Sequence, residues 1–236
     1  MRQVGLFWAG YFRTIYIPEI DTFAQCLVDR ILPTFNNLED EAKEIEEAEN
    51  ERLSALSCPD DDGAVIAEKA FEAGLDHFVR MRNMRQGILN MFCSGLYHLF
   101  EQLLINFYRL EIFGIGREVE HNLSIKRVKQ DFLEKTGLDL GLIGDWQLID
   151  ELRLIANTVK HADGDSSLAL KEKKPNAFVN PALAGFPTLR RKPGPVFKPM
   201  FGEDLYVKLE DFSLYVETVK RFWLELANLI ESNYKY

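Results

Sequence analysis

The chain has 236 residues, of which 47% are hydrophobic and 28% are charged, and its formal net charge is −9 at pH 7. This composition is typical of a globular protein with enough apolar residues for a sizeable core. No unbroken apolar run reaches the ~18 residues that span a bilayer, and the N-terminal segment lacks the cleavage pattern of a signal peptide. We therefore expect neither a membrane-spanning nor a secreted protein.

The three cysteines, Cys26, Cys58 and Cys93, are odd in number and form no CxxC pair. Such a set favours a reducing compartment, and hence a cytoplasmic protein, over a disulfide scaffold. We expect Cys26 and Cys93 to be core residues.

The charge is unevenly distributed along the chain. Residues 39–62 hold eleven acidic and two basic side chains, so this segment alone carries −9, whereas residues 166–200 hold seven basic side chains and one acidic one. Because the charges are segregated, the basic segment could bind an anionic partner although the whole chain is negative. It argues against a protein that coats nucleic acid non-specifically.

Hydrophobic periodicity predicts a first long helix over about residues 19–57, capped at Asp21 and kinked or broken at Pro33. Its acidic part, residues 39–52, is polar nearly all round, which indicates a solvated arm or, as the alternative, a docking surface for a basic protein partner. A second helix is predicted over about 64–112. Its later part is apolar on most faces, as is typical of the centre of a bundle.

Shorter elements follow in the second half of the chain. We predict a helix over about 124–135, a helix capped by Asp145 that stops at Gly164, and a final helix over about 210–232. Between the last two, residues 163–203 hold six of the nine prolines and are predicted to form an irregular basic loop, with a brief extended piece at 203–209. The apolar face of the final helix comprises Phe212, Tyr215, Val216, Val219, Phe222, Trp223, Leu226 and Ile230.

These elements predict an all-α fold, an elongated helical bundle with two long antiparallel helices. Residues 1–62 are expected to form an N-terminal helical arm with the acidic segment, and residues 63–236 the bundle itself. His98 and Glu101 have the i, i+3 spacing of a metal-binding pair, but no other histidine of the chain is followed three residues later by an acidic residue. We therefore expect no metal centre and no cofactor.

Polar chemistry is most concentrated in the segment 151–164, ELRLIANTVKHADG. Arg153, Asn157 and His161 are spaced four residues apart, so they form one row along a helix. The apolar residues Leu152, Ile155 and Val159 fall on the opposite side. We expect this row to face solvent in a monomer.

The same segment resembles the signature of the HEPN superfamily, all-helical domains in which an Arg followed four to six residues later by His marks a metal-independent RNase site. An Asn often follows that Arg directly. Here Asn157 and His161 have the Asn-to-His spacing, but Ala156 stands at the usual Arg position and Arg153 lies about one turn away. The resemblance implies a HEPN-like bundle that forms a homodimer across this face, with a second His supplied by the two-fold partner.

The chemistry of such a site assigns a role to each residue. The imidazole of His161 would remove the 2′-OH proton, Arg153 would stabilise charge on the phosphate, and Asn157 would orient either group. Lys160 is a further candidate for phosphate binding. Arg190, Arg191 and Lys192 are candidates for binding the RNA backbone, although a solvated loop is the simpler interpretation of these three.

A purely structural interpretation is also open: Arg153 pairs with an acid such as Glu101 or Glu151, and His161 interacts with the helix dipole. Three functions therefore remain. The first, favoured because of Ala156, is a HEPN-like domain with weak or no catalysis that binds RNA or a partner, which the resemblance associates with bacterial defence or toxin systems. The second is an active metal-independent RNase, and the third is an adaptor bundle that binds no nucleic acid.

Overall fold

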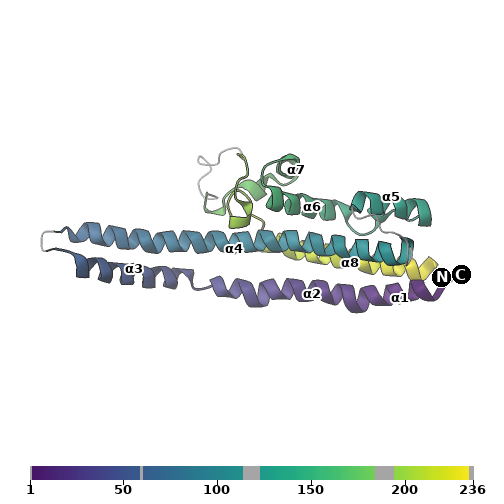
Figure 1. Ribbon diagram of the computed structural model, residues 1–236, viewed down its shortest axis with the longest axis horizontal. Coiled ribbons are helices and arrows are strands. Elements are labelled where there is room, and N and C mark those ends of the chain that lie inside the picture. Colours follow the sequence, from purple (N-terminus) through teal and green to yellow (C-terminus); the bar gives the residue numbers. More distant parts are fainter. Residues whose placement is uncertain (1, 59–60, 114–122, 184–193, 234–236) are drawn as a thin grey trace.

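The computed structural model describes residues 2–58, 61–113, 123–183 and 194–233. These residues form helices and turns and contain no strand, which confirms the all-α fold class. The α-helices are α1 (Arg2–Tyr11), α2 (Ile17–Gln25), α3 (Leu38–Leu56), α4 (Gly63–Phe107), α5 (Ile125–Thr136), α6 (Trp146–His161), α7 (Asp165–Lys173) and α8 (Leu209–Asn233). Figure 1 shows that they assemble into an elongated bundle with both termini at one end.

The N-terminal segment is helical almost from its start. α1 passes through a π-helical turn at Phe12–Tyr16 into α2, and a second π-helical turn at Cys26–Ile31 precedes a 3₁₀ turn at Leu32–Phe35. The predicted start near residue 19 is therefore wrong, and Asp21 lies inside α2 rather than at a cap. The predicted break at Pro33 is confirmed, because the proline lies in the 3₁₀ turn that separates this segment from α3.

The 45-residue helix α4 is the longest element, and the other helices are arranged around it. The carboxylate of Asp62 caps its start by accepting a hydrogen bond from the Ala64 N–H at 2.9 Å. α3 lies beside the first half of α4, whereas α1, α2 and α8 lie beside the second half (Figure 1). The prediction of a helix over about 64–112 is confirmed, since π-helical turns continue α4 to Phe113.

α4 also has the length and composition of a membrane-crossing helix. Within Gly63–Glu111 an 18-residue window has a mean hydropathy of 1.2, and no other helix in the described ranges meets the same criterion. Polar residues such as Asn90, His98 and Glu101 interrupt the apolar part of α4, so it contains no unbroken apolar run of that length. Core helices of bundles meet this criterion too, and 39% of the window is buried inside the fold.

The core is built around aromatic rings from α4, α8 and the π-helical turn after α1. The ring centroids of Phe12 and Tyr16 each lie 4.9 Å from that of Trp223, and Phe100 lies 5.1 Å from Phe222. The predicted apolar face of α8 is confirmed, because all eight of its residues are buried. The N-terminal helices thus share one core with α4 and α8.

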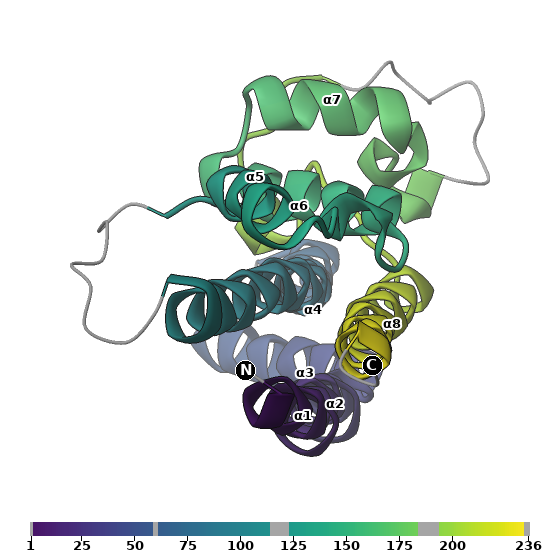
Figure 2. The same ribbon diagram turned by 90° about the vertical axis from the view of Figure 1, so that its right-hand side faces the viewer.

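A second layer of helices covers one side of α4. Figure 2 shows α6 between α4 and α7, with α5 beside it. The prediction of an irregular loop over 163–203 is wrong in part, since α7 occupies Asp165–Lys173 and 3₁₀ turns form at Pro175–Phe178, Pro181–Leu183 and Pro199–Phe201. Gly164 begins α7 rather than ending α6, and its N–H donates to the Ser167 hydroxyl at 3.1 Å. Residues 205–208 form no strand.

The segment before α8 crosses directly over α4. The side-chain amide of the buried Asn90 donates to the carbonyls of Pro199 and Leu205, both at 2.8 Å. At the crossing, a Cβ atom on Gly87 would lie 2.1 Å from the carbonyl oxygen of Met200. A glycine at position 87 is therefore what permits the two backbones to approach this closely.

We predict that Gly87→Ala lowers the free energy of unfolding by at least about 2 kcal/mol, because the added methyl group displaces the crossing segment. Urea unfolding followed by circular dichroism measures the change. Gly10→Ala is the matched control: its Cβ would meet nothing within 4 Å, so inside a helix it should leave stability unchanged or raise it by up to about 1 kcal/mol. Equal stability of the two variants would contradict the prediction.

The cysteines differ from the prediction at one position. Cys93 is fully buried, as predicted, but Cys26 is exposed, as is Cys58. Its neighbour Leu27 takes the core position instead, within the π-helical turn that starts at Cys26. Burial raises the pKa of the Cys93 thiol, so little of the reactive thiolate forms at neutral pH.

We predict that a thiol reagent such as Ellman's reagent modifies two cysteines of the native protein rapidly and the third only after unfolding. The absorbance of the released thiolate counts the reacted groups. The Cys93→Ala variant should give the same native count and lose only the slow group. Rapid modification of all three thiols in the native protein would contradict the burial of Cys93.

Candidate functional site

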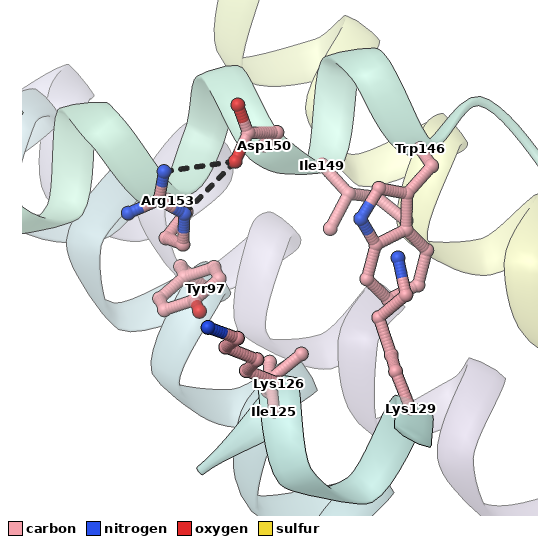
Figure 3. Close-up of a pocket in the computed structure, with 8 residues that line it drawn as sticks. All are labelled: Tyr97, Ile125, Lys126, Lys129, Trp146, Ile149, Asp150 and Arg153. Carbon is pink, nitrogen blue, oxygen red and sulfur yellow. Dashed lines mark hydrogen bonds and ion pairs between the residues drawn. The ribbon is translucent and has the colours of Figure 1, made fainter. Parts of the chain in front are cut away.

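A pocket of about 310 Å³ lies between α4, α5 and α6. Figure 3 shows its lining, to which α4 contributes one residue, α5 three and α6 four. We call it the cationic pocket, because its lining holds three cationic side chains and one carboxylate, for a formal charge of +2. The lining residues are Tyr97, Ile125, Lys126, Lys129, Trp146, Ile149, Asp150 and Arg153.

Two helix starts position these side chains. The Ser124 hydroxyl accepts a hydrogen bond from the Arg127 N–H at 3.3 Å and begins α5. The carboxylate of Asp145 accepts from the N–H groups of Gln147 and Leu148 at 3.1 and 3.2 Å, which confirms the predicted cap of α6. Because residues three and four apart share a helix face, the four α6 residues of the pocket point the same way.

Only part of the positive charge is neutralised within the pocket. The guanidinium of Arg153 donates to Asp150 at 2.9 Å, and the ammonium of Lys173 donates to the other oxygen of the same carboxylate at 3.1 Å. Burial alone would raise the pKa of Asp150, but these hydrogen bonds outweigh it and lower the pKa. Lys126 is exposed and forms no ion pair with any residue in the described ranges.

Two aromatic and two isoleucine side chains form the rest of the pocket lining. The Lys129 ammonium lies 4.0 Å from the centre of the half-buried Trp146 ring, a cation–π contact. Tyr97 is 5% exposed, and burial raises the pKa of its hydroxyl. The hydroxyl therefore stays neutral at physiological pH and can donate or accept hydrogen bonds but not supply charge. Cations beside aromatic rings suit a phosphate group with an attached planar ring.

Of the predicted row on α6, only one residue lines this pocket. Arg153 lines it, whereas Asn157 is half-buried and His161 is exposed, one and two turns further along. At a rise of ~1.5 Å per residue, His161 lies roughly 12 Å along the helix from Arg153. The three residues therefore do not converge on one point. Lys160 is exposed as well, and Arg190, Arg191 and Lys192 lie outside the described residues.

The acidic partner of Arg153 differs from the two that were predicted. Arg153 pairs with Asp150, three residues earlier on the same helix, whereas Glu101 faces His98 and Glu151 binds Lys174. The apolar residues opposite the row, Leu152, Ile155 and Val159, are buried as predicted. Leu154 and Thr158 are buried too, because α6 is covered by α7 as well as by α4 (Figure 2).

Ala156, at the position that the HEPN signature reserves for Arg, has no exposed surface and belongs to the core. A guanidinium there would bury a charge without a partner, which costs several kcal/mol. This chain therefore cannot present an arginine at that position without rearranging α6. Among the residues that the structure describes, no three His, Cys, Asp or Glu side chains gather closely enough to hold a metal ion.

On the opposite side of α6 a polar cluster fixes the helix in place. The ammonium of Lys174 donates to Glu151 at 3.0 Å, to Asp211 at 2.9 Å and to the hydroxyl of Tyr215 at 3.3 Å, and that hydroxyl donates to Glu151. Burial alone would lower the pKa of Lys174, but the hydrogen bonds to Asp211 and Glu151 outweigh it and leave the pKa raised. The cluster joins α6, α8 and the end of α7, and so fixes how α6 presents Arg153.

No family model matches the chain, and neither a curated protein nor a solved structure is significantly similar to it. The likeness to the HEPN superfamily thus depends on the segment 151–164. Sequence analysis identified Arg153 but not Lys126, Lys129 or Trp146, for which the sequence offered only basic residues and an aromatic residue near two helix starts.

We predict that Lys174→Met lowers the free energy of unfolding by about 2 kcal/mol, because it leaves the carboxylates of Glu151 and Asp211 half-buried without a cation. Lys173→Met is the matched control. The side chain of Lys173 is 43% exposed and, among the described residues, bonds only Asp150, so its loss should cost less than about 1 kcal/mol. Chemical denaturation measures both variants. A larger loss for Lys173→Met than for Lys174→Met would contradict the role of the cluster.

Proposed function

We propose that this chain is a helical RNA-binding protein that holds single-stranded RNA in the cationic pocket without cleaving it. The observation that carries the proposal is the placement of Lys126, Lys129 and Arg153 beside the rings of Tyr97 and Trp146. Proteins bind phosphates with such cations and stack unpaired bases on exposed aromatic rings, a role that the half-buried Trp146 can serve, while the buried Tyr97 offers its hydroxyl.

Binding without turnover is favoured over an active RNase by the position of the candidate groups. Cleavage without a metal needs a base and a cation on the same phosphate. His161 lies two helical turns from Arg153, and the buried Ala156 takes the place of the signature arginine. Arg153 is moreover engaged by Asp150, which suits a group that binds an anion by exchange of partners rather than one poised for catalysis.

The proposal also covers the type of helical bundle and its protein partner. We propose a HEPN-like bundle built on two long antiparallel helices, with a role in bacterial defence or toxin systems that the resemblance alone suggests. The acidic stretch 39–52 is largely exposed on α3 and is the surface that we would assign to a basic protein partner. An adaptor without RNA binding remains the competing function.

We predict that a short labelled single-stranded RNA binds the protein with an affinity that falls steeply as salt rises, because phosphate contacts release counterions. Lys126→Glu should weaken binding about tenfold and reduce the salt slope by about one. Lys43→Glu on α3 is the matched control: it makes the same charge change at an exposed lysine outside the pocket lining. Filter binding across a salt series measures all three proteins.

Two outcomes separate the competing functions. Equal loss of binding in Lys126→Glu and Lys43→Glu, or no binding by the wild-type protein at micromolar concentration, would contradict the pocket and favour the adaptor. RNA cleavage in EDTA that disappears in His161→Ala would instead establish the RNase. Quenching of Trp146 fluorescence by RNA gives a local readout, since Trp8 and Trp223 are buried.

A further inference from the structure

One stripe of side chains runs along α4 from its distal end, next to the turn after α3, into the core. The residues lie three or four apart and so share one helix face. In the core half of the stripe, Leu89, Cys93, Leu96 and Phe100 are all buried. α8 covers this half, as the contact between Phe100 and Phe222 at 5.1 Å shows. The members of the stripe, in order, are Phe71, Leu75, Phe78, Arg82, Arg85, Leu89, Cys93, Leu96 and Phe100.

At Phe71 and Leu75, in the distal half of the same stripe, no helix among the described residues covers α4, whereas Arg82 and Arg85 lie beside Pro181 and Tyr206 of the segment before α8. Phe71 is 55% exposed and Leu75 is 47% exposed. α8 begins at Leu209 and extends toward the chain termini, so it does not reach this part of α4 (Figure 1). α3 packs on another side of α4, where Ala70 is buried and Gly74 closely approaches the Ala42 carbonyl. The apolar stripe on α4 is thus covered by α8 in its core half and exposed to solvent at Phe71 and Leu75 in its distal, open half.

Charges of opposite sign lie at the two ends of the open half. Arg82 and Arg85 are exposed at the end nearer the core, and neither forms an ion pair within the described ranges. Glu68 is exposed at the distal end, seven residues before Leu75, just as Arg82 lies seven residues after it. The open half is therefore self-complementary: when two copies are laid antiparallel about Leu75, Arg82 of each copy meets Glu68 of the other.

We propose that this open half of the stripe is a homodimer interface, with the two-fold axis passing near Leu75. A two-fold contact joins the same patch of both copies, so Phe71, Leu75 and Phe78 of one chain pack against the same three residues of the other. Arg82 of each chain then lies opposite Glu68 of the second copy. The second copy thus covers the distal half of the stripe on α4, as α8 covers the core half. This interface is separate from the cationic pocket and does not depend on the proposed RNA binding.

The first test uses sedimentation equilibrium on the full chain. We expect a dimer at micromolar concentration and an at least 30-fold weaker dimer, by order of magnitude, for the double variant Phe71→Ser/Leu75→Ser, since both copies lose apolar contact. Leu133→Ser is the matched control, because Leu133 is 48% exposed on α5 and should leave dimerisation unchanged. Circular dichroism verifies that each variant is folded.

A charge exchange then tests the register. Arg82→Glu and Glu68→Arg should each weaken the dimer, and the double variant should restore it, because the exchange recreates the ion pair with reversed signs. Residues 68 and 82 of one chain lie fourteen positions apart on one helix, roughly 21 Å by helical rise. Rescue therefore has to come from a contact between two copies.

Three results would overturn the proposal. A monomer at about 100 µM, the weak limit for a specific contact of this size, excludes the dimer. A dimer that withstands Phe71→Ser/Leu75→Ser places the contact elsewhere. A dimer that dissociates with Asn157→Arg but not with the α4 variants places it at the row on α6 that the HEPN resemblance implies. Rescue in the charge-exchanged variant supports the proposed register.

Discussion

The contact of Trp223 with Phe12 and Tyr16 is the interaction around which the fold is organised. It joins α8 to the N-terminal helices, and Phe100 brings α4 into the same cluster at 6.0 Å from Trp223. Large rings bury much apolar surface and pack at few angles, so the cluster fixes both the positions and the directions of three helices. All of this packing lies in the core half of α4, which leaves the distal half with α3 as its main neighbour.

The second layer depends on that cluster through polar contacts rather than rings. Asn90 and Gln86 hold the segment before α8 on α4, with Gln86 donating to the Val207 carbonyl at 2.8 Å. Lys174 then ties the end of α7 to α6 and α8. The cationic pocket is formed where this layer meets α4. Its shape is therefore supported by hydrogen bonds made by residues outside its lining, which is typical of binding sites supported by a rigid scaffold.

Most helices of the fold could be predicted because their periodicity is long and regular. α4, α5 and α8, the cap at Asp145 and the burial of Cys93 all follow from apolar spacing and capping chemistry. α7 was missed because it is only nine residues long and directly precedes the proline-rich part of the segment, which starts at Pro175. Cys26 was misplaced because a π-helical turn changes the number of residues per turn and so shifts the helix face. The pocket could not be predicted, because it joins Tyr97, Lys126 and Arg153 from three helices.

The shared carboxylate of Asp150 gives the pocket a further property. It accepts hydrogen bonds from Arg153 in the pocket and from Lys173 at the end of α7. An anion in the pocket competes with Asp150 for the guanidinium of Arg153. When Arg153 binds the anion, Asp150 keeps Lys173 as its one cation and binds it more strongly. Occupancy of the pocket and attachment of α7 are thus linked equilibria. Such coupling is reciprocal. A change that breaks the Lys173–Asp150 ion pair strengthens the Arg153–Asp150 pair, and the pocket then binds the anion with lower affinity.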